Sequence, residues 1–240
     1  MKFDIITIFP RIFDSYFNES ILARAQKNKL IEIKTHNLRD YTEDKHKKVD
    51  DTPYGGGAGM VLMADPIIKA VDNISKTNPT SLKLRGARKT KIVLFSAKGK
   101  QFNQKMAYDW SKKFDQIILI AGRYEGIDER VVKALKAEEV SVGPYVLTDG
   151  EVPAMAVVSA VSRLVPGVIK LDSLAEESHW SQLIKREGTG KKEEKGSGLE
   201  YPHYTRPEVL EYKGKKYRVP KVLLSGDHKK IEEWRKAQVK

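Results

Sequence analysis

The stretch Gly122-Arg123-Tyr124-Glu125-Gly126-Ile127-Asp128-Glu129-Arg130 directly follows the apolar run Ile117–Ala121. An apolar run of this length that ends at a glycine indicates a buried strand. The two glycines predict a sharp turn, and the acidic residues from Asp128 onward favour the first turn of a helix. Three large polar side chains are thereby placed at the carboxyl end of a strand, where open α/β sheets bind their ligands.

On its own this segment is equally compatible with an ordinary strand-to-helix turn. Two further strands also run into loops that contain glycine, and together the three loops favour a binding site. Glycine lets backbone N–H and C=O groups approach a flat, uncharged ring closely, as recognition of a purine requires. The two other strand–loop pairs are Lys91–Ser96 with Ser96-Ala97-Lys98-Gly99, and Glu139–Val142 with Gly143–Glu151.

Strands alternate with helices along most of the chain, which predicts an α/β domain with a mostly parallel sheet. Expected strands are Phe3–Ile8, Ile31–His36, Lys91–Ser96, Gln116–Ala121 and Glu139–Val142. Expected helices are Pro10–Gln26, Asp65–Lys76, Gln101–Lys112, Asp128–Lys136, Val152–Leu164 and, with Asp227 as its N-cap, Asp227–Lys240. Composition changes after Pro166-Gly167, so we expect a large domain over residues 1–165, a linker over 166–200 and a small C-terminal domain over 201–240.

Charge and composition limit the kinds of partner and chemistry that the protein can have. Against 32 Asp and Glu the chain has 44 Lys and Arg, a net charge of +12, which favours a polyanionic partner such as RNA or DNA. Cysteine is absent, which excludes disulfides, thiolate metal sites and a cysteine nucleophile. The chain has neither a run of 18 apolar residues nor a signal-peptide pattern, so we expect a cytoplasmic protein that does not enter membranes.

Several common functional motifs are missing. There is no phosphate-binding loop, no dinucleotide fingerprint and no nucleophile elbow, and the five histidines lack metal-ligand spacing. The segments that remain informative are Val49–Gly57, Gly122–Arg130, Tyr145–Glu151 with Pro153-Ala154-Met155, Val161-Ser162-Arg163, Pro166-Gly167-Val168, Tyr201–Leu210 and Val222–His228. In this order they closely resemble segments of the bacterial tRNA (guanine-N1)-methyltransferases, knotted enzymes of the SPOUT class.

This resemblance implies methyl transfer from S-adenosylmethionine to N1 of guanosine 37 in tRNA. It also implies a deep trefoil knot, a small, mainly helical C-terminal domain that binds the anticodon stem-loop, and a homodimer with its active sites at the interface. The cofactor residues it implies are Leu94, Ser96, Gly99, Gly122, Tyr124, Glu125, Val142, Gly143, Tyr145, Leu147 and Gly150. The substrate-binding residues it implies are Asp50, Tyr54, Gly55, Tyr204 and Arg206. The family makes a Mg²⁺ requirement plausible, although the sequence has no cluster of metal ligands that indicates one.

Arg163 matches the family's catalytic arginine. The family's general base lies in an Asp-Ser-Phe motif, from which this chain departs. Glu177 has the best-matching spacing, and Asp172 and His179 are the alternatives. A second departure is Asp149, where a glycine is common; it either stiffens the cofactor loop or contacts the ligand's amino group. Two other hypotheses stay open: a related enzyme for another RNA and, because the base is altered, an RNA-binding relative without activity.

Overall fold

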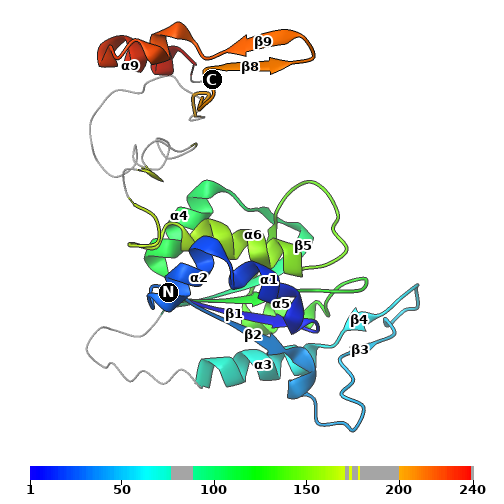
Figure 1. Ribbon diagram of the computed structural model, residues 1–240. Coiled ribbons are helices and arrows are strands. Elements are labelled where there is room, and N and C mark those ends of the chain that lie inside the picture. The colour runs from blue at the N-terminus through cyan, green and yellow to red at the C-terminus, as the bar shows by residue number, and fades with distance from the viewer. Residues whose placement is uncertain (77–88, 171–172, 175–177, 179–199, 239–240) are drawn as a thin grey trace. The chain divides into compact units, whose positions relative to one another are not determined.

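A computed structural model gives the fold of residues 1–76, 89–170, 173–174, 178 and 200–238. The chain divides into two compact units, Met1–Ile169 and Lys170–Lys240. In Figure 1 the first unit runs from blue to yellow-green, and the described strands and helices of the second are orange and red.

The first unit is built on a sheet of five parallel strands in the order β2-β1-β6-β5-β7. The strands are β1 (Lys2–Thr7), β2 (Glu32–Asn37), β5 (Thr90–Gln101), β6 (Gln116–Ile120) and β7 (Glu138–Ser141). Every residue of β1 and β6 is buried, as expected for central strands of a parallel sheet that is covered on both faces. The predicted α/β fold with a mostly parallel sheet is confirmed. A separate antiparallel pair joins β3 (Asp50–Asp51) to β4 (Val61–Leu62).

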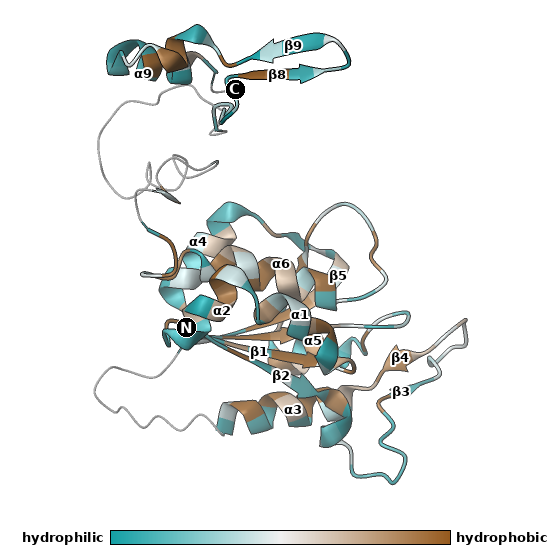
Figure 2. Ribbon diagram, in the orientation of Figure 1, coloured by the Kyte–Doolittle hydropathy of each residue, from teal (hydrophilic) through white to brown (hydrophobic). Residues whose placement is uncertain are grey.

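Helices cover both faces of this sheet, with α4 and α6 on one side and α3 on the other (Figure 1). The helices are α3 (Ala64–Lys76), α4 (Gln104–Lys113), α5 (Arg130–Leu135) and α6 (Glu151–Ser162). On the α3 side, Ile6, Ile118 and Ile120 of the sheet are buried in one cluster with Ile67 and Ile74 of α3. Figure 2 shows apolar residues along β1 and on the helices that pack against the sheet.

The single helix predicted over Pro10–Gln26 is wrong, because the structure divides it into three. These are η1 (Pro10–Phe13), α1 (Asp14–Phe17) and α2 (Ser20–Lys27), with extended backbone at Glu19. In an unbroken helix, Phe17 and Leu22 would point about 140° apart. The break lets both side chains be buried, and this gain is invisible in the local sequence pattern.

Asp4 is a fully buried carboxylate on β1, in the middle of the sheet. Its oxygens lie 2.8 Å from His36 Nε2, 2.7 Å from the donating Gln116 Nε2 and 3.1 Å from Lys2 Nζ. Burial by itself raises the pKa of Asp4. Hydrogen bonds from His36 and Gln116, together with the Lys2 ammonium, outweigh it and hold this pKa below its usual range.

The second unit carries β8 (Val209–Tyr212), β9 (Lys215–Arg218), η3 (Lys221–Leu224) and α9 (His228–Gln238). Asp227 caps α9, accepting a 3.2 Å hydrogen bond from Lys230 N, as the sequence predicted. The antiparallel hairpin β8–β9 was not anticipated, since a mainly helical domain was expected. Its turn is a Lys-Gly pair and lacks the asparagine or aspartate that usually marks such hairpins. Among the helices of the described ranges, none has the length and apolarity to cross a membrane.

Candidate active site

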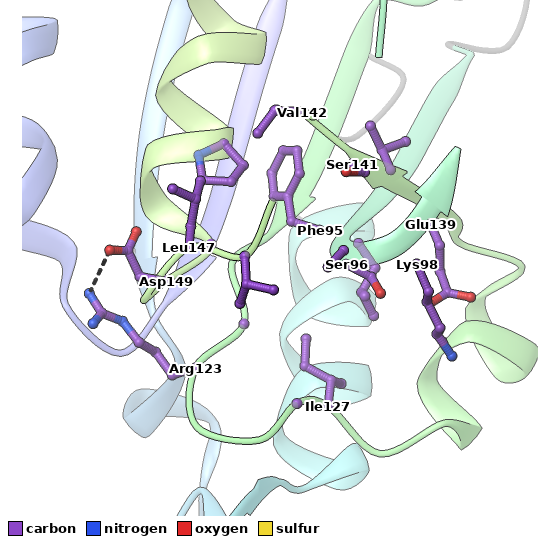
Figure 3. A pocket seen from close by; sticks show the side chains of 18 of the residues that line it. Phe95, Ser96, Lys98, Arg123, Ile127, Glu139, Ser141, Val142, Leu147 and Asp149 are labelled. Atoms are coloured by element: carbon purple, nitrogen blue, oxygen red, sulfur yellow. Dashed lines mark ion pairs between the residues drawn. The ribbon is translucent and has the colours of Figure 1, made fainter. Parts of the chain in front are cut away.

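A cavity of about 440 Å³ opens at the carboxyl ends of β5, β6 and β7. This volume lies in the usual range for small-molecule pockets, and this edge is where parallel sheets bind ligands. Three chain segments form most of its wall: Leu94–Lys98, Gly122–Ile127 and Tyr145–Gly150. Figure 3 shows side chains from all three segments around the cavity. The three loops singled out in the sequence therefore meet at one site.

The first segment is an irregularity within β5. The pairing of β5 with β7 shifts between Phe95 and Lys100, so the chain bulges out of the sheet toward the cavity. Lys98 on this bulge reaches two acidic residues, Glu129 Oε2 at 2.9 Å and Glu139 Oε1 at 3.3 Å. These two hydrogen-bonded carboxylates raise the pKa of Lys98, with the bond to Glu129 as the larger cause.

The second segment contains an uncommon backbone conformation. Tyr124 adopts a left-handed conformation with φ of 61°, and Gly126 follows with φ of 145°. A bulky residue in this region is strained, and such strain is typical of ligand-binding sites. The conformation leaves the Tyr124 side chain half-exposed at the cavity wall.

The third segment returns tightly against the second. Gly150 N donates a 2.9 Å hydrogen bond to Gly122 O. A Cβ atom on Gly150 would lie 2.5 Å from Gly122 N and 2.7 Å from Ala121 Cα, so only glycine fits here. These backbones therefore pack without an intervening side chain, forming a close-walled cradle that a flat ligand can enter.

The buried carboxylate of Glu151 links the second and third segments of the cavity wall. Glu151, the first residue of α6, is fully buried; Thr7 Oγ1 donates to its Oε1 at 2.5 Å and Arg123 Nε donates to its Oε2 at 3.0 Å. The Arg123 guanidinium also lies 4.8 Å from the centre of the Phe9 ring. A longer contact of 4.0 Å joins it to Asp149, shown as the dashed line in Figure 3. This role of Arg123 and Glu151 was not predicted from the sequence, although an acid at the start of an otherwise apolar helix is a signal for it.

Asp149 and Glu151 have opposite pKa shifts although they are two residues apart. Burial is the largest influence on both. In Glu151 it prevails over the bonds from Thr7 and Arg123 and raises the pKa. In Asp149 the hydrogen bonds from Val152 N and the Thr148 hydroxyl outweigh it and lower the pKa. Asp149 thus helps to cap the start of α6, which agrees with the loop-stiffening alternative.

A fourth segment, the glycine-rich loop around Gly59, is joined to the Arg123 turn. Met60 N donates to Glu125 Oε2 at 3.1 Å, and Glu125 N donates to Met60 O at 3.1 Å. Leu62 N continues this ladder with a 3.0 Å bond to Gly126 O. The loop expected to contact substrate is therefore held beside the pocket without lining it.

The predicted cofactor residues gather at the cavity with two exceptions. Those that line it are Leu94, Ser96, Gly122, Tyr124, Glu125, Val142, Tyr145, Leu147 and Gly150. Gly99 instead packs against the backbone of β7, where a Cβ atom would lie 2.5 Å from Val140 N. Gly143 leaves room for the Tyr145 ring, which lies 2.2 Å from the position of its missing Cβ. These two glycines shape the wall from behind.

Of the predicted catalytic residues, Arg163 is described by the structure, and it does not line this cavity. Arg163 lies at the C-terminal end of α6, whereas Gly150 at its N-terminal end lines the cavity. A 12-residue helix separates the two, a distance of about 18 Å. Glu177 and its alternatives, Asp172 and His179, lie outside the described residues.

The predicted substrate residues fall in two places. Asp50 belongs to β3, Tyr54 is 99% exposed, and Gly55 has a φ of 87° with open space around it. Tyr204 and Arg206 are exposed in the second unit, and the Tyr204 ring centre lies 6.2 Å from that of Trp234. Within the described ranges no three histidine or acidic side chains gather as metal ligands.

Fold and site together define a class: a parallel α/β protein with a ligand pocket at the carboxyl ends of three neighbouring strands. Residues 1–240 match the family described as tRNA (Guanine-1)-methyltransferase TrmD, and the chain belongs to this family. It is 47% identical to the tRNA (guanine-N(1)-)-methyltransferase of Ruminiclostridium cellulolyticum over 99% of this chain and 91% of that protein. It is 50% identical to that of Thermomicrobium roseum, over 98% and 78% of the respective chains. The resemblance drawn from the sequence is confirmed.

Proposed function

We propose that this enzyme transfers a methyl group from S-adenosylmethionine to N1 of guanosine 37 in tRNA. The observation that carries the proposal is the cavity at the ends of β5, β6 and β7, in a chain that matches the methyltransferase family from end to end. The net charge of +12 suits a tRNA substrate. A cytoplasmic location fits a tRNA-modifying enzyme.

The cavity suits an adenosine-containing methyl donor. Gly122 and Gly150 bring bare backbone to its wall, and Leu94, Val142 and Leu147 add apolar surface for a purine ring. Glu125 lines the cavity, and its carboxylate favours the sulfonium cation of the donor. When bound, S-adenosylmethionine supplies the electrophilic methyl group.

The protein's own contribution is to prepare guanine N1. This nitrogen carries a proton and is a poor nucleophile until a general base removes it. Negative charge then develops toward O6, where an arginine is a suitable fixed donor. We assign these roles to Glu177, with Asp172 and His179 as alternatives, and to Arg163. Holding N1 in line with the methyl group supplies a further part of the acceleration.

A homodimer can bring Arg163 to a cavity although the two lie far apart within one chain. In one chain the length of α6 separates them, so we propose that Arg163 acts at the cavity of the partner subunit. The surface beside the cavity supports this arrangement, because Phe9, Ile12 and Val152 are between 41% and 50% exposed. Large apolar side chains left in water next to a site are typical of interfaces.

We further propose that residues 1–165 form the cofactor-binding domain, that 166–200 link it to the rest, and that 201–240 bind the anticodon stem-loop. The tight passage of Gly150 against Ala121 supports a trefoil knot in the first domain. The candidate tRNA contacts are Asp50, Tyr54, Gly55, Tyr204 and Arg206.

The test is methyl transfer from labelled S-adenosylmethionine to a tRNA transcript with guanosine at position 37, against the same transcript with adenosine there. We expect transfer to the first only, and loss of transfer in Glu177→Gln. Transfer that survives in Glu177→Gln reassigns the base to Asp172 or His179. Transfer to ribosomal RNA alone, or cofactor binding without turnover on any RNA, contradicts the proposal.

A further inference from the structure

The hairpin β8–β9 projects from η3 and α9 as two short strands joined by Lys213 and Gly214 (Figure 1). Both turn residues have positive φ, 48° and 72°, which is the pattern of a type I′ turn. Lysine is uncommon in this conformation, where asparagine or glycine is favoured.

The strand register divides the hairpin into two different faces. Residues directly opposite each other in an antiparallel pair point to the same side, and neighbours along a strand alternate. Leu210 pairs with Tyr217, and Tyr212 pairs with Lys215. These four residues form one surface, here called the tyrosine face. The opposite face carries Val209, Glu211, Lys216 and Arg218.

Three of the four side chains on the tyrosine face are large and apolar or aromatic, and they are exposed to water. Leu210, Tyr212 and Tyr217 are 55%, 59% and 53% exposed. A two-stranded hairpin without a covering layer is marginally stable, so it gains from a partner. Clustered exposed apolar side chains of this size mark a binding surface.

Positive charge surrounds these aromatic rings. The hairpin carries Lys213, Lys215, Lys216 and Arg218 against the single acid Glu211. None of its four cations forms an ion pair with another residue of the described ranges. Lys213 Nζ instead lies 5.4 Å from the centre of the Tyr212 ring, so charge and ring form one unit at the tip.

We propose that the tyrosine face is a contact surface for the tRNA substrate. Lys213 and Lys215 neutralise phosphates, while Tyr212 and Tyr217 pack on ribose or base faces between them. Lysines interleaved with aromatic rings are the pattern by which proteins bind nucleic-acid strands. An apolar protein partner would leave these lysines without counter-ions. The inference rests on the proposed function, because it takes tRNA as the partner.

The alternation of the strand offers a matched pair of variants in the full-length protein. Lys215→Gln and Lys216→Gln remove the same charge from adjacent residues of one strand, but on opposite faces. We expect Lys215→Gln to weaken tRNA binding and to reduce the slope of log affinity against log salt by about 0.9, as for one lost phosphate contact. Lys216→Gln keeps the wild-type slope. Equal effects of the two variants overturn the proposal.

Two further substitutions separate recognition from folding. Tyr217→Ala is expected to weaken tRNA binding by roughly fivefold or more, and Tyr217→Phe to retain it, since stacking needs the ring alone. Asparagine suits the turn at position 213 better than lysine does, so Lys213→Asn does not weaken the hairpin. A lower tRNA affinity at unchanged thermal stability is then due to the lost charge. In turnover assays the effects fall mainly on KM for tRNA.

Unchanged tRNA affinity in both Tyr217→Ala and Lys213→Asn refutes the tyrosine face as an RNA surface. A change of oligomeric state in Tyr217→Ala, seen by sedimentation without a change in tRNA affinity, assigns the face to a second copy of the chain and also refutes the proposal. Wild-type turnover on the guanosine-37 transcript is measured alongside. If the wild type shows no turnover, the result counts against the proposed function. If the wild type turns over and the variants bind tRNA as tightly as it does, the result counts against this inference alone.

Discussion

Gly59→Ala tests whether the glycine-rich loop positions Glu125 at the pocket. Gly59 has a φ of 75°, and a Cβ atom there would lie 1.9 Å from the Glu125 carboxylate. Alanine therefore displaces that carboxylate, and the 3.1 Å hydrogen bond from Met60 N to Glu125 Oε2 is lost. The glutamate side chain is flexible and can swing outward, so the protein still folds.

Gly56→Ala is the matched control. Gly56 has nearly the same φ, 80°, but nothing lies within 4 Å of the added carbon. Both variants carry the cost of a left-handed alanine, about 1–2 kcal/mol. Only Gly59→Ala loses the bond to Glu125, which at this exposed position contributes about 1 kcal/mol. The hydrogen bond from Met60 N fixes the Glu125 carboxylate at the cavity wall. If the loss of about 1 kcal/mol carries over in full to the cofactor, its affinity falls about fivefold.

Calorimetric titration with S-adenosylmethionine measures this difference, and urea unfolding measures the shared strain. We expect weaker cofactor binding in Gly59→Ala than in Gly56→Ala, and a free energy of unfolding lower by about 1 kcal/mol in Gly59→Ala. In a Glu125→Ala background, Gly59→Ala should have no further effect on cofactor binding. Equal cofactor affinity in the two glycine variants would refute the coupling of this loop to Glu125.

Three other predictions concern buried charge and subunit assembly. Arg123→Ala leaves Glu151 buried without its cation and is expected to lower the free energy of unfolding by about 3 kcal/mol. Adding Glu151→Gln should recover part of that loss in urea unfolding, and a double variant no more stable than Arg123→Ala would contradict the buried pair. The pKa of Asp4 is lowered in the folded state, so the stability that its charge contributes is present above the unfolded value near 3.9 and is lost as pH falls through the folded pKa. Asp4→Asn should therefore be less stable than wild type at pH 7, and the difference should shrink as the pH falls below the unfolded pKa of Asp4; a difference independent of pH would argue against this linkage. Leu147→Trp fills the cavity and Arg163→Ala removes the proposed donor, so the homodimer of either variant is expected to be inactive. A mixed dimer of the two variants keeps one complete site, made of the open cavity of the Arg163→Ala subunit and the arginine of the Leu147→Trp subunit. This mixed dimer is therefore expected to regain turnover. An inactive mixed dimer, with both variants folded, would place cavity and arginine in the same chain.

Much of the architecture follows from short-range patterns. The apolar run through Ile117–Ala121 predicted a central strand because only a strand covered on both faces is apolar at every residue. The glycines that end this and the neighbouring strands located the loops of the pocket. The break after Phe17 and the hairpin around Lys213 were missed. In the first case distant core contacts decide the backbone, and in the second the turn lacks its usual residues.

The site was predictable as a set of loops but not as a network. An acid at the start of an apolar helix marks Glu151 as unusual, but nothing local to it indicates that its partners are Thr7 and Arg123, residues more than a hundred positions apart in sequence. The separation of Arg163 from the cavity likewise depends on how α6 is laid across the sheet. Such relations arise from tertiary packing and become visible only in the folded chain.

The most direct test of the function is the position of the methyl group on the product. A guanosine-37 tRNA is methylated with labelled S-adenosylmethionine, digested to nucleosides and compared with standards of the isomeric methylguanosines. The proposed function predicts label in N1-methylguanosine from position 37, and none there in Leu147→Trp. Label on another atom or at another nucleotide, or no label although the cofactor binds, would contradict it.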